Sequence, residues 1–209
     1  MPRKAASRLP YALVLLAATI GAAIGLGIAL LRSPHVPTAS EAPLKAQITW
    51  PSGAKQAPSV ALRDQTGAPV SLRSLRGHVV LLTFLDSRCK RACPVEGRTL
   101  GDVQHRVKGS GAILAVVSID PWADTAASAR AFAARAGWHG NWHWLLGQKA
   151  TLAPVWAAYN IAVKRTPGDV LHVAALYLVD PRGDLRAGYL FPFAPDVVAH
   201  DVQRLAGSV

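Results

Sequence analysis

Two short, continuous apolar runs stand out in the pattern of hydrophobic and polar positions along the chain. Residues 79–85 (VVLLTFL) and 112–119 (AILAVVSI) are rich in β-branched side chains, which is typical of strands buried on both faces of a sheet. Between them, residues 94–107 have helical character, and Pro94 suits the first turn of a helix. The pattern therefore predicts a strand–helix–strand unit at the centre of an α/β fold.

The flanking segments predict further strands and helices of the same fold. Short apolar segments and turn residues predict a hairpin of residues 60–63 and 70–72, a strand at 142–146, and strands 173–179 and 185–190 that pair across the turn 180–183. The predicted helices are an alanine-rich run that Asp124 or Thr125 caps and that ends at Gly137, residues 152–159, and a last helix that begins near Pro195. No internal repeat and no second domain are expected.

An apolar stretch without a single charge occupies residues 11–31. At 1.5 Å per helical residue, its length matches the ~30 Å of a bilayer core, so it predicts a transmembrane anchor. Because Arg3, Lys4 and Arg8 precede it and the leader contains no acid, the positive-inside rule places residues 1–10 in the cytoplasm and everything after the anchor outside. A cleaved signal peptide is the alternative, although its apolar region is usually only about 7–15 residues long.

Composition indicates one exported domain after the anchor. Residues 32–58 are rich in proline and predict an extended linker, which leaves residues 59–209 for a single domain with a sizeable core. Apolar residues make up 51% of the chain and charged residues 17%, which excludes both a disordered chain and a multi-span membrane protein. The net charge is +11, and for a domain that faces outward we expect anionic lipid or an acidic protein surface as a partner, and no nucleic acid.

Both cysteines of the chain, Cys89 and Cys93, follow the first central strand, at the position where ligands bind in open α/β sheets. The CxxxC spacing places the two sulfurs about one helical turn apart, close enough to hold one metal ion or to form a disulfide. The helix N-terminus and the side chains of Arg88, Lys90 and Arg91 favour the thiolate form. A purely structural disulfide is the alternative, but so short a loop removes little entropy from the unfolded chain.

Two cysteines leave room for a third metal ligand, and thiolates select copper(I) or zinc. Among the seven histidines, His172 is the best candidate because it directly precedes the predicted strand 173–179 and can face the cysteine loop. His139 and His143 have the i, i+4 spacing of a metal-binding pair, but Gly140 and Asn141 favour a turn, so we interpret them as packing residues. The other histidines are interpreted as ordinary solvated side chains: His35, His78, His105 and His200.

These motifs together resemble the Sco/SenC family of copper-binding, thioredoxin-like assembly proteins, in which a CxxxCP motif and a distant histidine bind copper. The resemblance covers roughly residues 59–206. It includes the turn 64–67, the entry to the strand at 75–80, the CxxxCP motif at 89–94, the segment 117–121 followed by Asp124 and Thr125, and His172 before 176–183. It implies a thioredoxin-like α/β fold, with a central mixed β-sheet flanked by helices, after an N-terminal transmembrane helix.

The resemblance also implies a function. Cys89, Cys93 and His172 would form a three-coordinate copper(I) site that also accepts copper(II), with Asp120 near it, although Asp120 also suits a plain turn before Pro121. The implied role is that of a metallochaperone rather than an enzyme. In that role it would deliver copper, or reducing equivalents, to the binuclear copper site of cytochrome c oxidase subunit II or to another acceptor protein with a copper site. The short basic start of the chain favours a bacterial inner membrane, with the domain in the periplasm.

Two other functions stay open at this point. One is a periplasmic thiol–disulfide oxidoreductase that uses Cys89 and Cys93 without a metal, and the other is a peroxide-reducing or redox-sensing protein. The position after the first cysteine, often proline in the family, is Lys90, and this extra charge strengthens the redox interpretation. The CxxxC spacing and His172 favour copper instead. Since no methionine follows Met1, a copper site depends on these three residues and not on thioethers.

Overall fold

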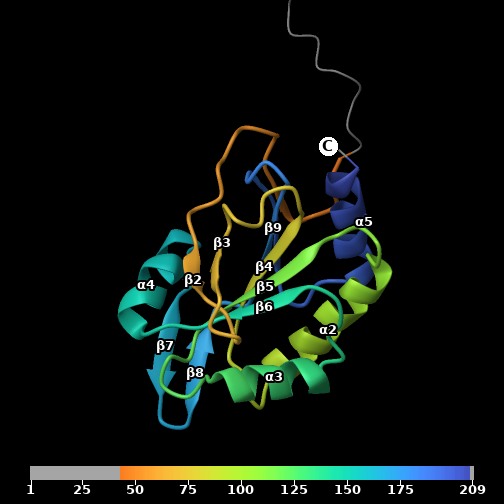
Figure 1. Cartoon of the computed structure of the whole chain (residues 1–209). Coiled ribbons are helices and arrows are strands. Elements are labelled where there is room, and N and C mark those ends of the chain that lie inside the picture. Colours follow the sequence, from red (N-terminus) through yellow and green to blue (C-terminus); the bar gives the residue numbers. More distant parts are fainter. Residues whose placement is uncertain (1–42, 208–209) are drawn as a thin grey trace, which may run out of the picture. The chain divides into compact units, whose positions relative to one another are not determined.

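Six strands form the central sheet of residues 43–207, the part of the chain that this computed structural model describes (Figure 1). Their order across the sheet is β1 (Ile48–Thr49), β10 (Leu185–Leu190), β9 (Ala175–Val179), β4 (Val80–Leu85), β5 (Ile113–Ser118) and β6 (Trp142–Leu145). Strands β4, β5 and β6 are parallel, whereas β9 runs antiparallel to β4 and to β10. The sheet is therefore mixed, as predicted.

The two central strands, β4 and β5, are buried along their whole length. Alternate side chains point to opposite faces of the sheet. Leu81 and Leu85 of β4 belong to the core on one face, whereas Leu82 and Phe84 belong to the core on the other. Burial on both faces explains why these strands are continuous apolar runs in the sequence.

Helices cover both faces of the sheet. On one face lie α2 (Cys93–Arg106), α3 (Ala126–Arg135) and α5 (Pro195–Ala206), and on the other lies α4 (Lys149–Ala158) beside the hairpin of β2 (Ala61–Arg63) and β3 (Pro69–Ser71) (Figure 1). Each of these elements was predicted, with ends that differ by a few residues. The largest difference is in α4, which begins three residues before the predicted start at Leu152.

Helices α2 and α3 approach closely at a glycine. A Cβ atom added to Gly101 of α2 would lie 2.5 Å from the carbonyl oxygen of Ala136, which follows α3. Because this neighbour is backbone, it cannot rotate away as a side chain would. Glycine is therefore required where the two helices meet.

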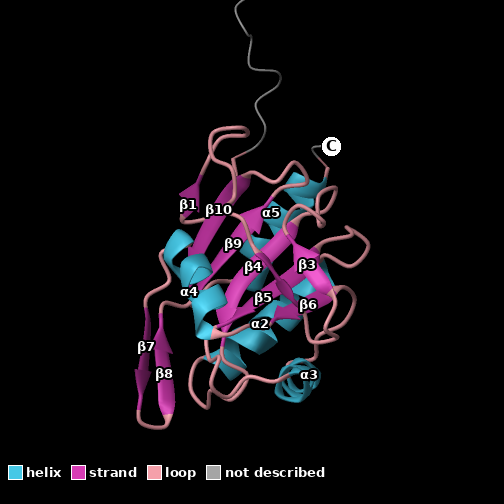
Figure 2. Ribbon diagram, turned by 60° about the vertical axis from the view of Figure 1, so that its left-hand side comes forward, coloured by secondary structure: helices cyan, strands magenta, loops and turns pink. Residues whose placement is uncertain are grey.

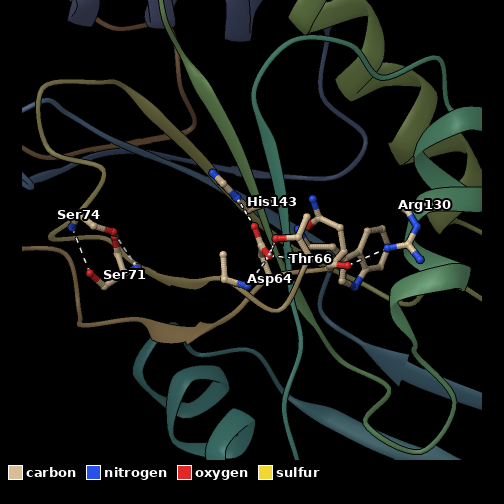
Figure 3. Close-up of polar contacts among 9 residues, drawn as sticks. Asp64, Thr66, Ser71, Ser74, Arg130 and His143 are labelled. Atoms are coloured by element: carbon tan, nitrogen blue, oxygen red, sulfur yellow. Dashed lines mark hydrogen bonds and ion pairs between the residues drawn. The ribbon is translucent and has the colours of Figure 1, made fainter.

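The turn between β2 and β3 is fastened to the edge of the main sheet through Asp64 (Figure 3). The Asp64 carboxylate accepts hydrogen bonds from the backbone N–H and the hydroxyl of Thr66, at 2.8 and 2.6 Å, and pairs at 2.9 Å with Nδ1 of His143 on β6. Nearby, Arg130 donates to the carbonyl of Gln65 at 2.8 Å. His143 thus has a structural role, consistent with its interpretation as a packing residue.

A second hairpin, which the sequence analysis missed, projects from the body of the domain (Figure 2). It consists of β7 (Val163–Thr166) and β8 (Asp169–His172), which pair with each other. The predicted strand 173–179 is consequently too long, because the main-sheet strand β9 begins only at Ala175 and His172 ends β8. The two strands are only four residues long each, and their exposed, half-buried and buried positions do not alternate regularly, so they leave little periodic signal in the sequence.

The folded unit begins earlier in the chain than predicted. Its first residue is Leu44, and Ile48–Thr49 pair with β10, so residues 44–58 of the expected linker belong to the domain. The predicted anchor at residues 11–31 lies outside the described residues. Within residues 43–207, none of the helices has both the length and the apolar character needed to cross a bilayer.

Candidate metal centre

The loop that carries Cys89 follows β4 directly, and α2 begins at the second cysteine, Cys93. Asp86, the first residue of this loop, is 3% exposed. Its carboxylate accepts a hydrogen bond of 2.6 Å from the backbone N–H of Arg88, and its carbonyl accepts one of 3.4 Å from the N–H of Cys89. These bonds hold the loop in a turn at the carboxyl end of the central strand, where the sequence placed the site.

His172 reaches this loop from the end of β8, 79 residues further along the chain than Cys93. Its Nε2 atom lies 3.6 Å from Sγ of Cys93, and its Nδ1 atom lies 3.0 Å from the carbonyl oxygen of Val173. Because a carbonyl only accepts, the proton of the neutral ring is on Nδ1, and the lone pair of Nε2 faces the sulfur. Burial lowers the pKa of His172, which favours this neutral ring.

The two cysteines differ strongly from each other. Cys89 is partly exposed and Cys93 is buried, and neither is in a disulfide. A hydrogen bond from the Cys93 thiol lowers the pKa of Cys89 to about 6, helped by the Arg91 backbone N–H, which lies 3.4 Å from the Cys89 sulfur. The same bond, together with burial, raises the pKa of Cys93 well above its usual range. The pair therefore holds one thiolate, on Cys89, and one thiol, on Cys93.

This asymmetry corrects the expectation that the helix N-terminus and the cations favour the thiolate at both positions. Cys93 occupies the helix N-terminus, yet its thiol keeps its proton. A second sulfur charge, buried and next to the Cys89 thiolate, is destabilised by more than the helix dipole stabilises it. The low pKa of Cys89 is confirmed, but its main cause is the neighbouring thiol rather than the lysine and arginine side chains.

Asp120 lies at the same edge of the sheet, just after β5. It is 7% exposed, its carboxylate accepts a hydrogen bond of 3.2 Å from the N–H of Trp122, and it lines the same cleft as Asp86. Asp120 thus forms a turn and also lies near the cysteine loop. Within residues 43–207, no three His, Cys, Asp or Glu side chains are already arranged around a metal-sized position. Three-coordinate binding by Cys89, Cys93 and His172 consequently requires these side chains to close on the ion.

Glu96, one helical turn after Cys93, is a residue of this site that sequence reasoning missed. It is 1% exposed, and its Oε2 atom has no hydrogen-bond partner among the described residues. The Thr83 hydroxyl lies 2.9 Å from Glu96 Oε1 and 3.0 Å from the carbonyl oxygen of Ala175. That hydroxyl has one hydrogen for two acceptors, so a proton on Glu96 completes the chain of bonds. Burial is the main cause that raises the pKa of Glu96 to about 7, and the charge of Cys89 adds to it.

The donor set fits a soft metal ion. The site offers two sulfurs and one imidazole nitrogen with a free lone pair, and such ligands prefer copper(I) over hard cations. The fold and the site therefore define a class: thioredoxin-like α/β proteins with a partly exposed and a buried cysteine beyond the carboxyl end of the central strand and a histidine from another element beside them.

Comparison with known proteins identifies the family within this class. The family model SCO1/SenC matches residues 52–207, and the chain belongs to this family. The SCO1 protein homolog of Bacillus subtilis (strain 168) is 30% identical over 134 residues, which are 61% of this chain and 69% of that protein. The resemblance inferred from the motifs is confirmed.

Solved structures of Sco proteins agree with this family assignment. The structure of Bradyrhizobium japonicum ScoI with copper bound has a TM-score of 0.64 and 25% identity, covering 72% of this chain and 99% of that one. A disulfide switch has been identified in BsSco, a member of the Sco family of cytochrome c oxidase assembly proteins. Its structure has a TM-score of 0.65 and 27% identity, covering 78% of this chain and 99% of that one. The predicted thioredoxin-like fold of the domain is thus confirmed.

Proposed function

We propose that this protein binds copper(I) through Cys89, Cys93 and His172, and that it acts in the assembly of cytochrome c oxidase. The observation that carries the proposal is the 3.6 Å approach of His172 Nε2 to Cys93 Sγ, with the opposite ring nitrogen occupied by the Val173 carbonyl. A histidine fixed in this tautomer presents a ready ligand to the cysteine pair. Membership of the SCO1/SenC family and the likeness to a copper-bound ScoI support the choice of metal.

The proposed acceptor is the binuclear copper site of cytochrome c oxidase subunit II. Copper is the cargo, and its release proceeds by ligand exchange, in which an acceptor thiolate replaces one sulfur of this protein at a time. Cys89 is the first ligand to leave, because it is the more exposed member of the pair. We also propose that residues 11–31 anchor the protein in a bacterial inner membrane with the domain in the periplasm. The uncharged sequence of that segment supports this arrangement.

The same site supports a second role, the reduction of an acceptor disulfide. The Cys89 thiolate attacks one sulfur of that disulfide and expels the other as a thiolate. Cys93 then gives up its proton, attacks Cys89 and releases the second acceptor thiol. Two electrons pass to the acceptor, and Cys89 and Cys93 end as a disulfide. A partly exposed thiolate beside a buried thiol is the observation that favours this role.

Anaerobic titration with copper(I) against a competing chelator tests the copper proposal on the reduced full-length chain. We expect one tightly bound copper, and His172→Ala or Cys93→Ser should weaken it by roughly two orders of magnitude, about 3 kcal/mol for one lost ligand. The matched control is His78→Ala. His78 is an exposed histidine just before the start of β4, at the end of the strand opposite the cysteine loop. Weak binding that is indifferent to His172 would leave the cysteines as a redox pair. Reduction of a small disulfide should largely survive His172→Ala.

A further inference from the structure

A cleft of about 850 Å³ opens beside the cysteine loop. Three segments line it: the loop after β4, the turn after β5, and the β7–β8 hairpin that projects at the lower left of Figure 2. Its volume lies in the range of ligand-binding clefts. Arg88 and Lys90, which flank Cys89 in the sequence, are both part of its wall. Anything that occupies the cleft therefore lies next to the reactive cysteine.

The carboxylates that line this cleft are already engaged. Asp86 and Asp120 are buried and accept backbone hydrogen bonds, as described above. Asp169 accepts a bond of 2.9 Å from the N–H of Val170, and its second oxygen pairs with Arg91 at 3.4 Å. These three carboxylates offset part of the positive charge of the lining, but each already has a partner in the wall of the cleft.

The cations, in contrast, are exposed. Arg88, Lys90 and Arg165 line the cleft and form no ion pair with any residue in the described range 43–207. Arg165 lies over the ring of Trp122, 4.7 Å from its centroid, and Lys149 lies 6.0 Å from the same ring. Trp122 is 41% exposed. Four cations thus line the cleft against three carboxylates, and its exposed cations surround an aromatic surface. This arrangement attracts acidic side chains that carry some apolar area.

We propose that this cleft is the docking site for an acidic segment of the acceptor protein. The inference rests on the proposed function and deepens it, because an acceptor must bring its own cysteines to Cys89. The chain itself does not supply an acidic occupant, because the residues before the folded unit contain a single acid, Glu41, and the whole chain has a net charge of +11. That net charge also opposes occupation by a second copy. An acidic segment placed across Arg165 and Trp122 would position the acceptor sulfurs at the cysteine loop.

Fluorescence anisotropy of a labelled 12-residue peptide tests the proposal with the reduced full-length protein in a non-ionic detergent. One peptide carries six glutamates and no cysteine, and its partner carries glutamine at the same six positions. The charge-reversal variant is Arg165→Glu with Lys149→Glu, the two cations that lie beside the ring of Trp122. The matched control is Lys108→Glu with Arg182→Glu, two exposed cations at the opposite end of the sheet.

We expect the wild-type protein to bind the glutamate peptide at least about tenfold more tightly than the glutamine peptide in low salt. The reversal should remove about tenfold or more of that affinity, the control should change it less than about twofold, and high salt should abolish the preference. If the reversal variant fails to fold, the glutamine variants of Arg165 and Lys149 carry the same test with a smaller effect.

Three results would overturn the proposal: an equal loss in the control variant, no preference for the glutamate peptide, or complete displacement of the peptide by inorganic phosphate at matched ionic strength, which would assign the cleft to a small anion. The assay contains neither copper nor a peptide cysteine. Failure of the proposed function appears instead in the copper titration, so the two failures are distinguishable.

Discussion

Glu96 makes the stability of the domain depend on pH in a way that one substitution can remove. Burial raises the pKa of this carboxyl from 4.5 to about 7 in the folded protein. At 1.36 kcal/mol per pKa unit, the difference corresponds to about 3 kcal/mol of unfolding free energy. The folded state binds the proton more tightly than the unfolded state. The contribution is therefore fully present below pH 4.5 and is lost as the pH rises through about 7.

Glu96→Gln replaces the protonated acid with a group of the same shape that still donates to the Thr83 hydroxyl and does not titrate. We expect the variant to be about as stable as the wild type at pH 5 and more stable, by roughly 2 to 3 kcal/mol, at pH 8.5. Urea denaturation followed by tryptophan fluorescence measures both free energies in the reduced protein without copper.

Asp102→Asn provides the control, because Asp102 is an exposed acid on the same helix. Its stability should follow the wild-type curve across this pH range. If the curve of Glu96→Gln also runs parallel to that of the wild type, the carboxyl is not protonated in the folded protein, and the proposed bond from Glu96 to Thr83 is refuted.

Two further predictions concern packing and metal binding. Gly101→Ala should lower the free energy of unfolding by about 1 to 2 kcal/mol, because the clash with the Ala136 carbonyl outweighs the ~1 kcal/mol that alanine gains in a helix, and a rise in melting temperature would contradict this packing. Copper(I) affinity should fall about tenfold per pH unit between pH 8 and 6, where Cys93 must lose its proton, and about a hundredfold per unit below pH 6, where Cys89 is also protonated. Chelator competition at each pH measures this slope, and a flat profile above pH 6 would remove Cys93 from the ligand set.

The sequence predicts the parts of the fold that have a strong periodic signal. Strands β4 and β5 are continuous apolar runs because both of their faces are buried, and α3 carries its cap at Thr125, where the hydroxyl accepts a hydrogen bond from the N–H of Ser128. Strand β1 was missed because two residues in a proline-rich stretch have no period of their own and are ordered by their partner β10.

The candidate site was predictable only in part, for related reasons. The cysteines are adjacent in the sequence, so their spacing alone indicates a shared site. Residues 79 positions apart meet through tertiary structure, so the position of His172 before a predicted strand made it a candidate, and the family resemblance added the weight that spacing alone does not give. Glu96 gave no signal at all, because an acid in the first turn of a helix is an ordinary favourable position on the surface. Its burial becomes visible only when the surrounding helices and strands are in place.

The division of the site between two elements has a consequence for its dynamics. The cysteines lie on the loop after β4 and at the start of α2, whereas His172 ends a ribbon whose two strands, within residues 43–207, pair only with each other. A copper ion bound to all three residues would cross-link the ribbon to the body of the domain. Binding free energy would then appear as reduced local opening of β7 and β8, and backbone amides of the ribbon should exchange hydrogen more slowly in the copper-loaded protein than in the copper-free one. Release of the metal to an acceptor would loosen the same ribbon, which forms one wall of the docking cleft. Copper transfer and the mobility of that wall would therefore be coupled.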